Sequence, residues 1–328
     1  MSVLLQMTAP TRADFEVPYH DFGPAAEAPT LACVAGLHGN ELNGVFVLAR
    51  LASYLKRLAA GGQQGASLRR RVLLIPAVNA LGLNVRRRAW PFDGTDLNRM
   101  FPGYDAGETT QRVAAAVLAA TRGARWRIDL HSSNVDFEEL PQVRLFAPNA
   151  EEREAARWLA LPAVIERPVT PTLTTTLAHA WLQAGRRGLV IQAGYAGGLQ
   201  PAHCERIFRA LVGFLVQSGA VEGLRLAEPE QEVHAFGPRQ SFPLISDHAG
   251  WFVSRFEVGR WLLAGELVGS VYDGFSGDLG AEIRTPVAGL LAGIRRQPLL
   301  CEGDLVARIL TREEFAHAPD TYLMGHGQ

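Results

Sequence analysis

The chain has 328 residues, with 32 Lys or Arg against 33 Asp or Glu, so its formal net charge is -1. This balance argues against a polyanion such as nucleic acid as the main partner. Hydrophobic residues make up 48% of the sequence, a globular composition that allows one large domain or two smaller ones. Because no apolar run reaches about eighteen residues, we expect no association with a membrane through a spanning helix.

Lysine and cysteine usage excludes further classes of protein. Lys56 is the only lysine and does not follow a glycine, so a phosphate-binding loop that ends in Gly-Lys is absent. The cysteines, Cys33, Cys204 and Cys301, are far apart and form no C-x-x-C motif, which predicts neither a thiolate metal site nor a disulfide framework. The N-terminal residues lack a signal-peptide pattern, and we therefore expect a cytoplasmic location.

The first two thirds of the chain alternate between short apolar runs and helical patterns. The alternation predicts an α/β sheet with helices on both faces. Strands are expected at residues 30–35, 72–78, 126–130, 143–146 and 189–193. Helices are expected at residues 41–58, 109–121, 150–160, 174–184 and 201–218. Residues 79–103 are rich in Gly, Pro and Asn, and a loop of this length in a compact domain is usually functional or disordered.

The pattern changes after about residue 223. Residues 242–310 read as short strands at roughly the 8–12-residue spacing of sandwiches and barrels, and glycines separate them. The sequence therefore predicts an α/β domain over residues 1–225 and a small β-sandwich or barrel over residues 226–328.

The segment Gly36-Leu37-His38-Gly39-Asn40-Glu41 lies where an apolar strand turns into a helix, at the ligand-binding edge of an open α/β sheet. His38 and Glu41 are three residues apart, so both side chains can point to one side. Imidazole and carboxylate are common ligands of catalytic zinc, which usually takes three protein ligands. This pair alone is weak evidence, because a helix cap with a surface carboxylate would look the same.

A second segment, Asp129-Leu130-His131, ends the apolar run at residues 126–130. If the two strands are neighbours, His131 emerges at the same sheet edge as His38 and is a candidate third ligand. Asp129 could orient a ligand from outside the metal's own donor set. The alternative for either histidine alone is a hydrogen-bonded residue at a strand end.

Between these segments lie Arg86-Arg87-Arg88 and the stretch from Asp96 to Gly103, where apolar positions are sparse. Arginine binds carboxylates through two parallel hydrogen bonds, and a guanidinium near a metal could polarise a carbonyl group. A solvated basic loop is an equally good reading of this stretch by itself.

Four motifs stand in order: G-L-H-G-N-E, an Asn–Gly–Arg pattern over residues 79–88, D-G-T-D-L-N-R-x-F-P-G and D-L-H-S. With them the chain resembles the succinylglutamate desuccinylase/aspartoacylase family, which belongs to the zinc carboxypeptidase-like group. The resemblance implies a mixed, open α/β sheet flanked by helices, followed by a small C-terminal all-β domain. It also implies one zinc per chain, ligated by His38, Glu41 and His131.

The resemblance further implies a role for the polar residues between the metal motifs. Asn98 and Arg99 match the pair that grips a substrate carboxylate, and Arg88 matches the arginine that polarises the scissile carbonyl, with Arg87 as an alternative. The implied reaction is hydrolysis of a small anionic N-acyl amino acid or related amide by metal-activated water.

One position departs from the family pattern. The family has a glutamate general base near the end of a late strand, and this chain has Gln192 there, in Leu189-Val190-Ile191-Gln192-Ala193-Gly194. A glutamine amide cannot accept a proton from the attacking water. An impaired or repurposed zinc-binding protein therefore remains an alternative, as does an esterase, since an alkoxide leaving group needs less protonation. The acyl group, the amine and a possible homo-oligomeric state stay open at this level.

Overall fold

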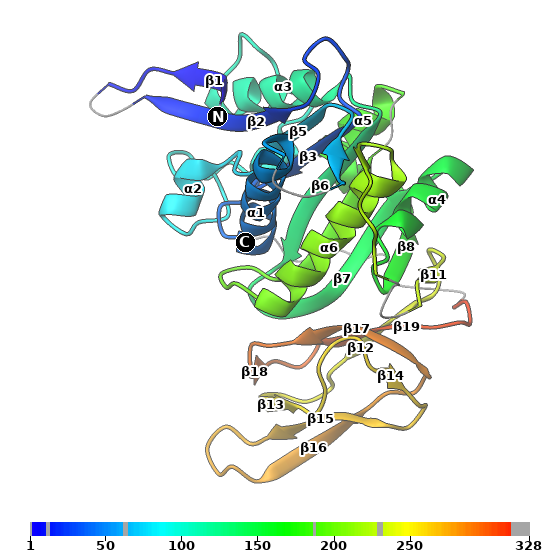
Figure 1. Cartoon of the computed structure of the whole chain (residues 1–328). Helices are drawn as coiled ribbons and strands as arrows, with labels where there is room; N and C mark the ends of the chain where they lie inside the picture. The colour runs from blue at the N-terminus through cyan, green and yellow to red at the C-terminus, as the bar shows by residue number, and fades with distance from the viewer. Residues whose placement is uncertain (1, 11–13, 62–64, 186–187, 228–231, 316–328) are drawn as a thin grey trace.

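The computed structural model describes residues 2–10, 14–61, 65–185, 188–227 and 232–315. Along the first two thirds of the chain, helices alternate with strands, and the colours of Figure 1 follow this order. The helices are α1 (Leu42–Ala59), α2 (Ala80–Asn84), α3 (Thr109–Thr121), α4 (Ala150–Trp158), α5 (Leu177–Gln183) and α6 (Pro201–Gln217), with short 3-10 turns η1 (Leu97–Arg99) and η2 (Pro171–Leu173).

A 13-stranded sheet forms the centre of the molecule, with the main order β1-β2-β5-β3-β6-β9-β7-β17-β19-β12. Strands β8, β11 and β14 branch from this path. The strands of the α/β part are β1 (Ser2–Met7), β2 (Phe15–Phe22), β3 (Leu31–Ala35), β5 (Val72–Ile75), β6 (Trp126–Ser133), β7 (Phe137–Phe146), β8 (Ala163–Arg167) and β9 (Leu189–Tyr195). A separate two-stranded pair joins β4 (Ser67–Leu68) to β10 (Val221–Glu222).

Helices cover both faces of the sheet in the α/β part. Neighbouring residues of a strand point to opposite faces, so each face presents apolar side chains against which helices pack. In β6, Trp126, Ile128 and Leu130 belong to a hydrophobic cluster with residues of α1, α4 and α6. A second cluster joins the other face of β3 and β5 to α3 and α5. Strands β5, β3, β6 and β9 are parallel, so their carboxyl ends meet at one edge of the sheet. Ligands of open α/β sheets bind at this edge.

The C-terminal part is built of strands, as predicted, and these strands pair antiparallel with one another, whereas β11 pairs in parallel with β8. They are β11 (His234–Phe236), β12 (Ser241–Ile245), β13 (Gly250–Ser254), β14 (Trp261–Leu262), β15 (Leu267–Tyr272), β16 (Leu279–Arg284), β17 (Gly289–Arg295), β18 (Leu299–Leu300) and β19 (Leu305–Leu310). A four-stranded sheet of β16, β15, β13 and β18 packs against β17 and β19 through a third hydrophobic cluster. These features confirm the predicted fold class, a mixed α/β sheet flanked by helices and followed by antiparallel β-sheets.

Strand β7 joins the two parts of the chain, because it pairs with β9 on one side and with both β8 and β17 on the other. The central sheet thus continues from the α/β part into the C-terminal strands, and the division at residues 225 and 226 stays a prediction.

Several elements differ from their predicted bounds. Strand β6 extends to Ser133 and therefore includes His131, and β7 begins at Phe137 instead of residue 143. The expected loop at residues 79–103 contains α2 and η1, and the hairpin of β1 and β2 was not predicted. Within the described residues, no helix is both long and apolar enough to cross a membrane.

Candidate metal centre

The turn from β3 into α1 places two of the predicted ligands. Gly36 has a φ of +66°, a left-handed conformation that favours glycine and lets the chain leave β3 sharply. His38 follows in the turn, and Glu41 is the residue that precedes the first turn of α1. Both side chains are buried, each with 3% of its surface exposed.

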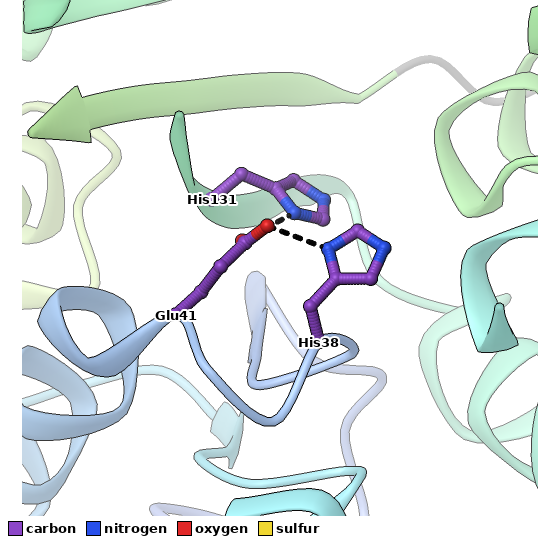
Figure 2. A group of neighbouring side chains, drawn as sticks. All are labelled: His38, Glu41 and His131. Atoms are coloured by element: carbon purple, nitrogen blue, oxygen red, sulfur yellow. Dashed lines mark hydrogen bonds and ion pairs between the residues drawn. The ribbon is translucent and has the colours of Figure 1, made fainter. Parts of the chain in front are cut away.

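His131 reaches the same place from the neighbouring strand. Strands β3 and β6 are parallel and in register from Leu31 and Trp126 to Ala35 and Leu130, so the next residue of β6 lies at the carboxyl edge of β3. The Glu41 carboxylate lies between the two imidazoles, as Figure 2 shows. Its Oε1 is 2.7 Å from His38 Nδ1 and its Oε2 is 3.0 Å from His131 Nδ1. One donor atom from each of the three residues lies within 4.8 Å of the others.

Each histidine also contacts a second carboxylate through its other ring nitrogen. His38 Nε2 is 3.0 Å from Asp96 Oδ1, and His131 Nε2 is 2.9 Å from Asp129 Oδ2. An Nε2–H that donates to a carboxylate leaves Nδ1 as the ligand atom, which is how metal-ligating histidines are usually oriented. Two imidazoles and a carboxylate, held in this way, fit a divalent cation such as zinc.

The charges of the site change the pKa values of its groups. Burial alone would raise the pKa of Glu41, but the two imidazoles outweigh it and hold that pKa well below its usual range. Burial would lower the pKa of His131, but Asp129 and Glu41 raise it to about 10. A metal ion that binds His131 would therefore have to displace a proton from the imidazole.

The polar residues from the loop before α3 lie around this centre. Arg88 is 3.1 Å from Glu41 Oε1 through Nη1 and 3.3 Å from Asp96 Oδ2 through Nη2. Asn98 is buried; its Oδ1 accepts a hydrogen bond from the N–H of Leu177, and its Nδ2 lies 3.5 Å from His131 Nε2. Only the NH₂ group of Asn98 is therefore left to contact a substrate.

Arg99 differs from these residues because it is exposed. Its Nη1 donates to the backbone carbonyl of Asn98 at 3.0 Å, which holds the side chain beside the site. Arg87 is also exposed, and its backbone carbonyl lies against the turn that carries His38.

Gln192 lies beside His131 on the neighbouring strand, since the two residues are partners in the register of β6 and β9. Its odd-numbered neighbours Ile191 and Ala193 pack in the cluster on the α1 face, so Gln192 points to the face of His131. The side chain is 7% exposed. The structure thus brings the predicted site residues to one sheet edge.

Two contacts at this edge were not predicted. Asp96 was noted only as part of a motif, although it orients His38. The backbone N–H of Ser132 donates to Glu41 Oε2 at 3.0 Å. The D-L-N-R motif could have indicated the contact of Asp96, and the extension of β6 beyond residue 130 could have indicated that of Ser132.

A profile of the succinylglutamate desuccinylase/aspartoacylase catalytic domain matches residues 27–216. The chain is 28% identical over 295 residues to an N-alpha-acetyl-L-2,4-diaminobutyric acid deacetylase from Halomonas elongata. That alignment covers 86% of this chain and 82% of the relative.

Solved structures share the fold at lower identity. The product-bound ectoine utilization protein EutE (DoeB) from Ruegeria pomeroyi has a TM-score of 0.74 at 20% identity, covering 91% of this chain and 90% of that one. A succinylglutamate desuccinylase from Silicibacter sp. TM1040 has a TM-score of 0.77 at 20% identity, covering 95% and 94% of the two chains.

Proposed function

The chain belongs to the succinylglutamate desuccinylase/aspartoacylase family, which is a family of enzymes, and we propose that it is a zinc-dependent hydrolase of a small anionic N-acyl amino acid. The observation that carries this proposal is the convergence of His38, Glu41 and His131 at the carboxyl edge of β3 and β6. The Asp96 and Asp129 carboxylates behind the two imidazoles support a metal-ligating role for both histidines.

A zinc ion held by these side chains would act as a Lewis acid and lower the pKa of water to about 7. The residues around it would position the substrate. Arg88 would donate to the carbonyl oxygen of the scissile amide, because its guanidinium lies against Glu41. Arg99, exposed beside the site, would bind the substrate carboxylate with two parallel hydrogen bonds, and Asn98 would contribute its NH₂ group.

The substrate class draws support from the diaminobutyric acid relative, whose name describes removal of an acetyl group from an amino acid nitrogen. A small amide of this kind suits a site in which one exposed arginine lies next to the metal ligands. We infer hydrolysis of a carbon–nitrogen bond outside a peptide chain.

Gln192 favours a second candidate, an impaired deacylase or an esterase. Its amide can hold the attacking water but cannot take its proton or pass a proton to the leaving nitrogen. General acid–base help is typically worth about 10²–10⁴-fold, so amide hydrolysis by this chain should be slow unless another group supplies it. An ester, whose alkoxide leaves with less protonation, would be less affected.

The test combines metal analysis with a panel of N-acetyl and N-succinyl amino acids and their ester analogues. We expect about one zinc per chain and turnover of at least one N-acyl amino acid. His38→Ala and His131→Ala should each lose the metal and the activity while the chain remains folded. His179→Ala serves as the control and should keep both, because the His179 imidazole on α5 is hydrogen-bonded only to Gln183 among the described residues. A wild-type chain that stays free of zinc after reconstitution would refute the site.

A further inference from the structure

A second charged cluster lies on the sheet face that carries His131, farther across the sheet toward the C-terminal strands. It consists of Glu139 and Arg144 from β7, Arg167 from β8 and Arg308 from β19. The side chains of Glu139, Arg167 and Arg308 are at least nine-tenths buried, and that of Arg144 is 19% exposed. Neither the metal centre nor its substrate-binding arginines use these residues.

Two of the arginines already bind the carboxylate of Glu139. Arg144 Nη2 lies 2.7 Å from Glu139 Oε1 and 2.6 Å from Oε2. Arg308 Nη1 donates to Glu139 Oε1 at 3.0 Å. It reaches Glu139 across β17, where Gly293 pairs with both residues and adds no side chain between them.

Arg167 lacks such a partner within the described part of the chain. Its Nε and Nη2 are buried without a hydrogen bond, and so is the Nε of Arg144. Gln142, which is 0% exposed, likewise has both amide atoms buried and unpaired. Gln142 pairs with Gln192 in the register of β7 and β9, and Gln192 pairs with His131, so these unsatisfied groups begin two strands from the metal centre.

Charge makes this arrangement costly as it stands. Within the described part of the chain, the guanidinium groups of Arg144, Arg167 and Arg308 all act on the carboxylate of Glu139. A guanidinium does not lose its proton in a protein. Burial and the positive charges of Arg144 and Arg308 lower the pKa of Arg167 well below its usual range. Because deprotonation is not available to arginine, a further negative charge nearby would relieve this repulsion. Asp129, on the same face of β6, accepts from His131.

We propose that Arg144, Arg167 and the amide of Gln142 bind a small anion of carboxylate size, held at the junction of β7 and β8. The anion would accept hydrogen bonds from the unpaired Nε and Nη2 of Arg167, from Arg144 Nε and from the Gln142 NH₂ group. The anion would add a second negative charge beside that of Glu139. Within this cluster, Arg308 on β19 already links Glu139 on β7 to the C-terminal strands.

The anion can come from two sources with the same chemistry. One is a free ion, such as acetate or chloride, that stays bound as part of the structure. The other is a second carboxylate on the substrate, since Gln142 and Gln192 are partners in neighbouring strands, and strands lie about 4.8 Å apart.

The first experiment measures the melting temperature of the metal-loaded protein during titrations with sodium acetate, sodium chloride and sodium bromide. We expect a saturable rise on the order of a few degrees for the wild type. Arg167→Met should abolish the saturable rise and melt below the wild type at saturating anion. Arg153→Met, which removes an exposed arginine paired with Glu166, should respond as the wild type does. If Arg167→Met responds like the wild type, or is more stable at every anion concentration, the proposal is wrong.

A second measurement covers the case in which Arg167→Met does not fold. Wild-type crystals grown with bromide should show an anomalous peak between Arg144 and Arg167. A lack of any peak at a saturating bromide concentration would overturn the proposal. Neither readout involves turnover, so both remain valid if the protein proves not to be a deacylase.

Bromide occupancy in crystals with N-acetylaspartate or N-acetylasparagine distinguishes the two sources of the anion. Only N-acetylaspartate carries a second carboxylate. Displacement of bromide by N-acetylaspartate alone would assign the site to a substrate carboxylate. Retention of bromide with both compounds would assign it to a resident free ion. Either result supports an anion site at these arginines.

Discussion

The two histidines of the candidate metal centre are oriented by carboxylates that come from different parts of the chain. Asp129 precedes His131 by two residues on the same strand, whereas Asp96 reaches His38 from a loop 58 residues later. Beside them, Gln192 lies next to His131 on β9, at the position where we propose that the family's general base would lie. The side chains that metal binding needs are therefore present, whereas the acid expected for proton transfer is missing.

Gln192→Glu tests this separation. The change is nearly isosteric, and the new carboxylate can accept a proton from water, so kcat/KM for an N-acetyl amino acid should rise at least about tenfold. Activity should then fall at low pH as the carboxylate becomes protonated. Gln217→Glu, an exposed change on α6, is the control and should leave the rate unchanged. An unchanged rate for Gln192→Glu, on a substrate that binds, would mean that another group already acts as the base.

Arg99→Lys tests the carboxylate-binding role of the exposed arginine. Lysine keeps the charge but cannot form two parallel hydrogen bonds, so KM for an N-acyl amino acid should rise by roughly tenfold or more. The corresponding amide, which lacks that carboxylate, should be nearly unaffected. Equal losses for the acid and the amide would show that Arg99 acts on the fold or on catalysis in general.

Among the elements, close backbone contact between the β3–α1 turn and α2 fixes the turn that carries the candidate ligand His38. Gly39 follows His38, and its N–H donates to the carbonyl of Arg88 at 3.1 Å. A Cβ atom at this position would lie 2.2 Å from the carbonyl carbon of Gly82 and 2.4 Å from the N of Leu83. These neighbours are backbone atoms, so they cannot move aside as a side chain can.

Gly39→Ala should therefore separate the turn from α2. We expect it to lower the free energy of unfolding by about 1–3 kcal/mol and to weaken zinc binding, because His38 lies in the displaced turn. Urea denaturation and zinc titration measure the two effects. Gly123→Ala, at an exposed position with no atom within 4 Å of the added Cβ, is the matched control. Wild-type zinc affinity in Gly39→Ala would contradict this account.

At the scale of the whole molecule, β7 connects the α/β part with the C-terminal strands through its charged residues. Glu138 accepts from His203 Nε2 on α6 at 2.6 Å and also pairs with Arg296, which follows β17. Burial would raise the pKa of Glu138, but the hydrogen bond from His203 and the charge of Arg296 outweigh burial and lower it. The ionised carboxylate is therefore more stable in the folded chain than in the unfolded one.

Glu138→Gln should destabilise the protein by about 1–3 kcal/mol near neutral pH. Because the folded-state pKa lies below the unfolded value of 4.5, the stabilisation is fully present above that value and is lost as the pH falls through the folded pKa. The two proteins should thus converge in stability under acid conditions, as urea denaturation at neutral and acid pH can show. Glu257→Gln removes the other, 77% exposed partner of Arg296 and should cost less. A difference that is independent of pH would contradict an ionic role.

Local sequence patterns predict the α/β alternation, the C-terminal β pattern and the three candidate metal ligands. These features follow from local spacing: periodic apolar residues define the elements, and His38, Glu41 and His131 each lie next to the end of an apolar run. Residues 109–121 form a helix with the predicted bounds because an apolar periodicity and polar flanks mark both ends.

Which residues these elements place side by side depends on the long-range pairing of the strands. The order of β3, β6, β9 and β7 brings His131, Gln192 and Gln142 into one row, and no local pattern specifies strand order. Arg144, Arg167 and Arg308 likewise come from three different strands, β7, β8 and β19. Of these strands, β8 was not expected at all. Contacts of this kind depend on long-range pairing and burial, which act between segments and leave no periodic signal within any one of them.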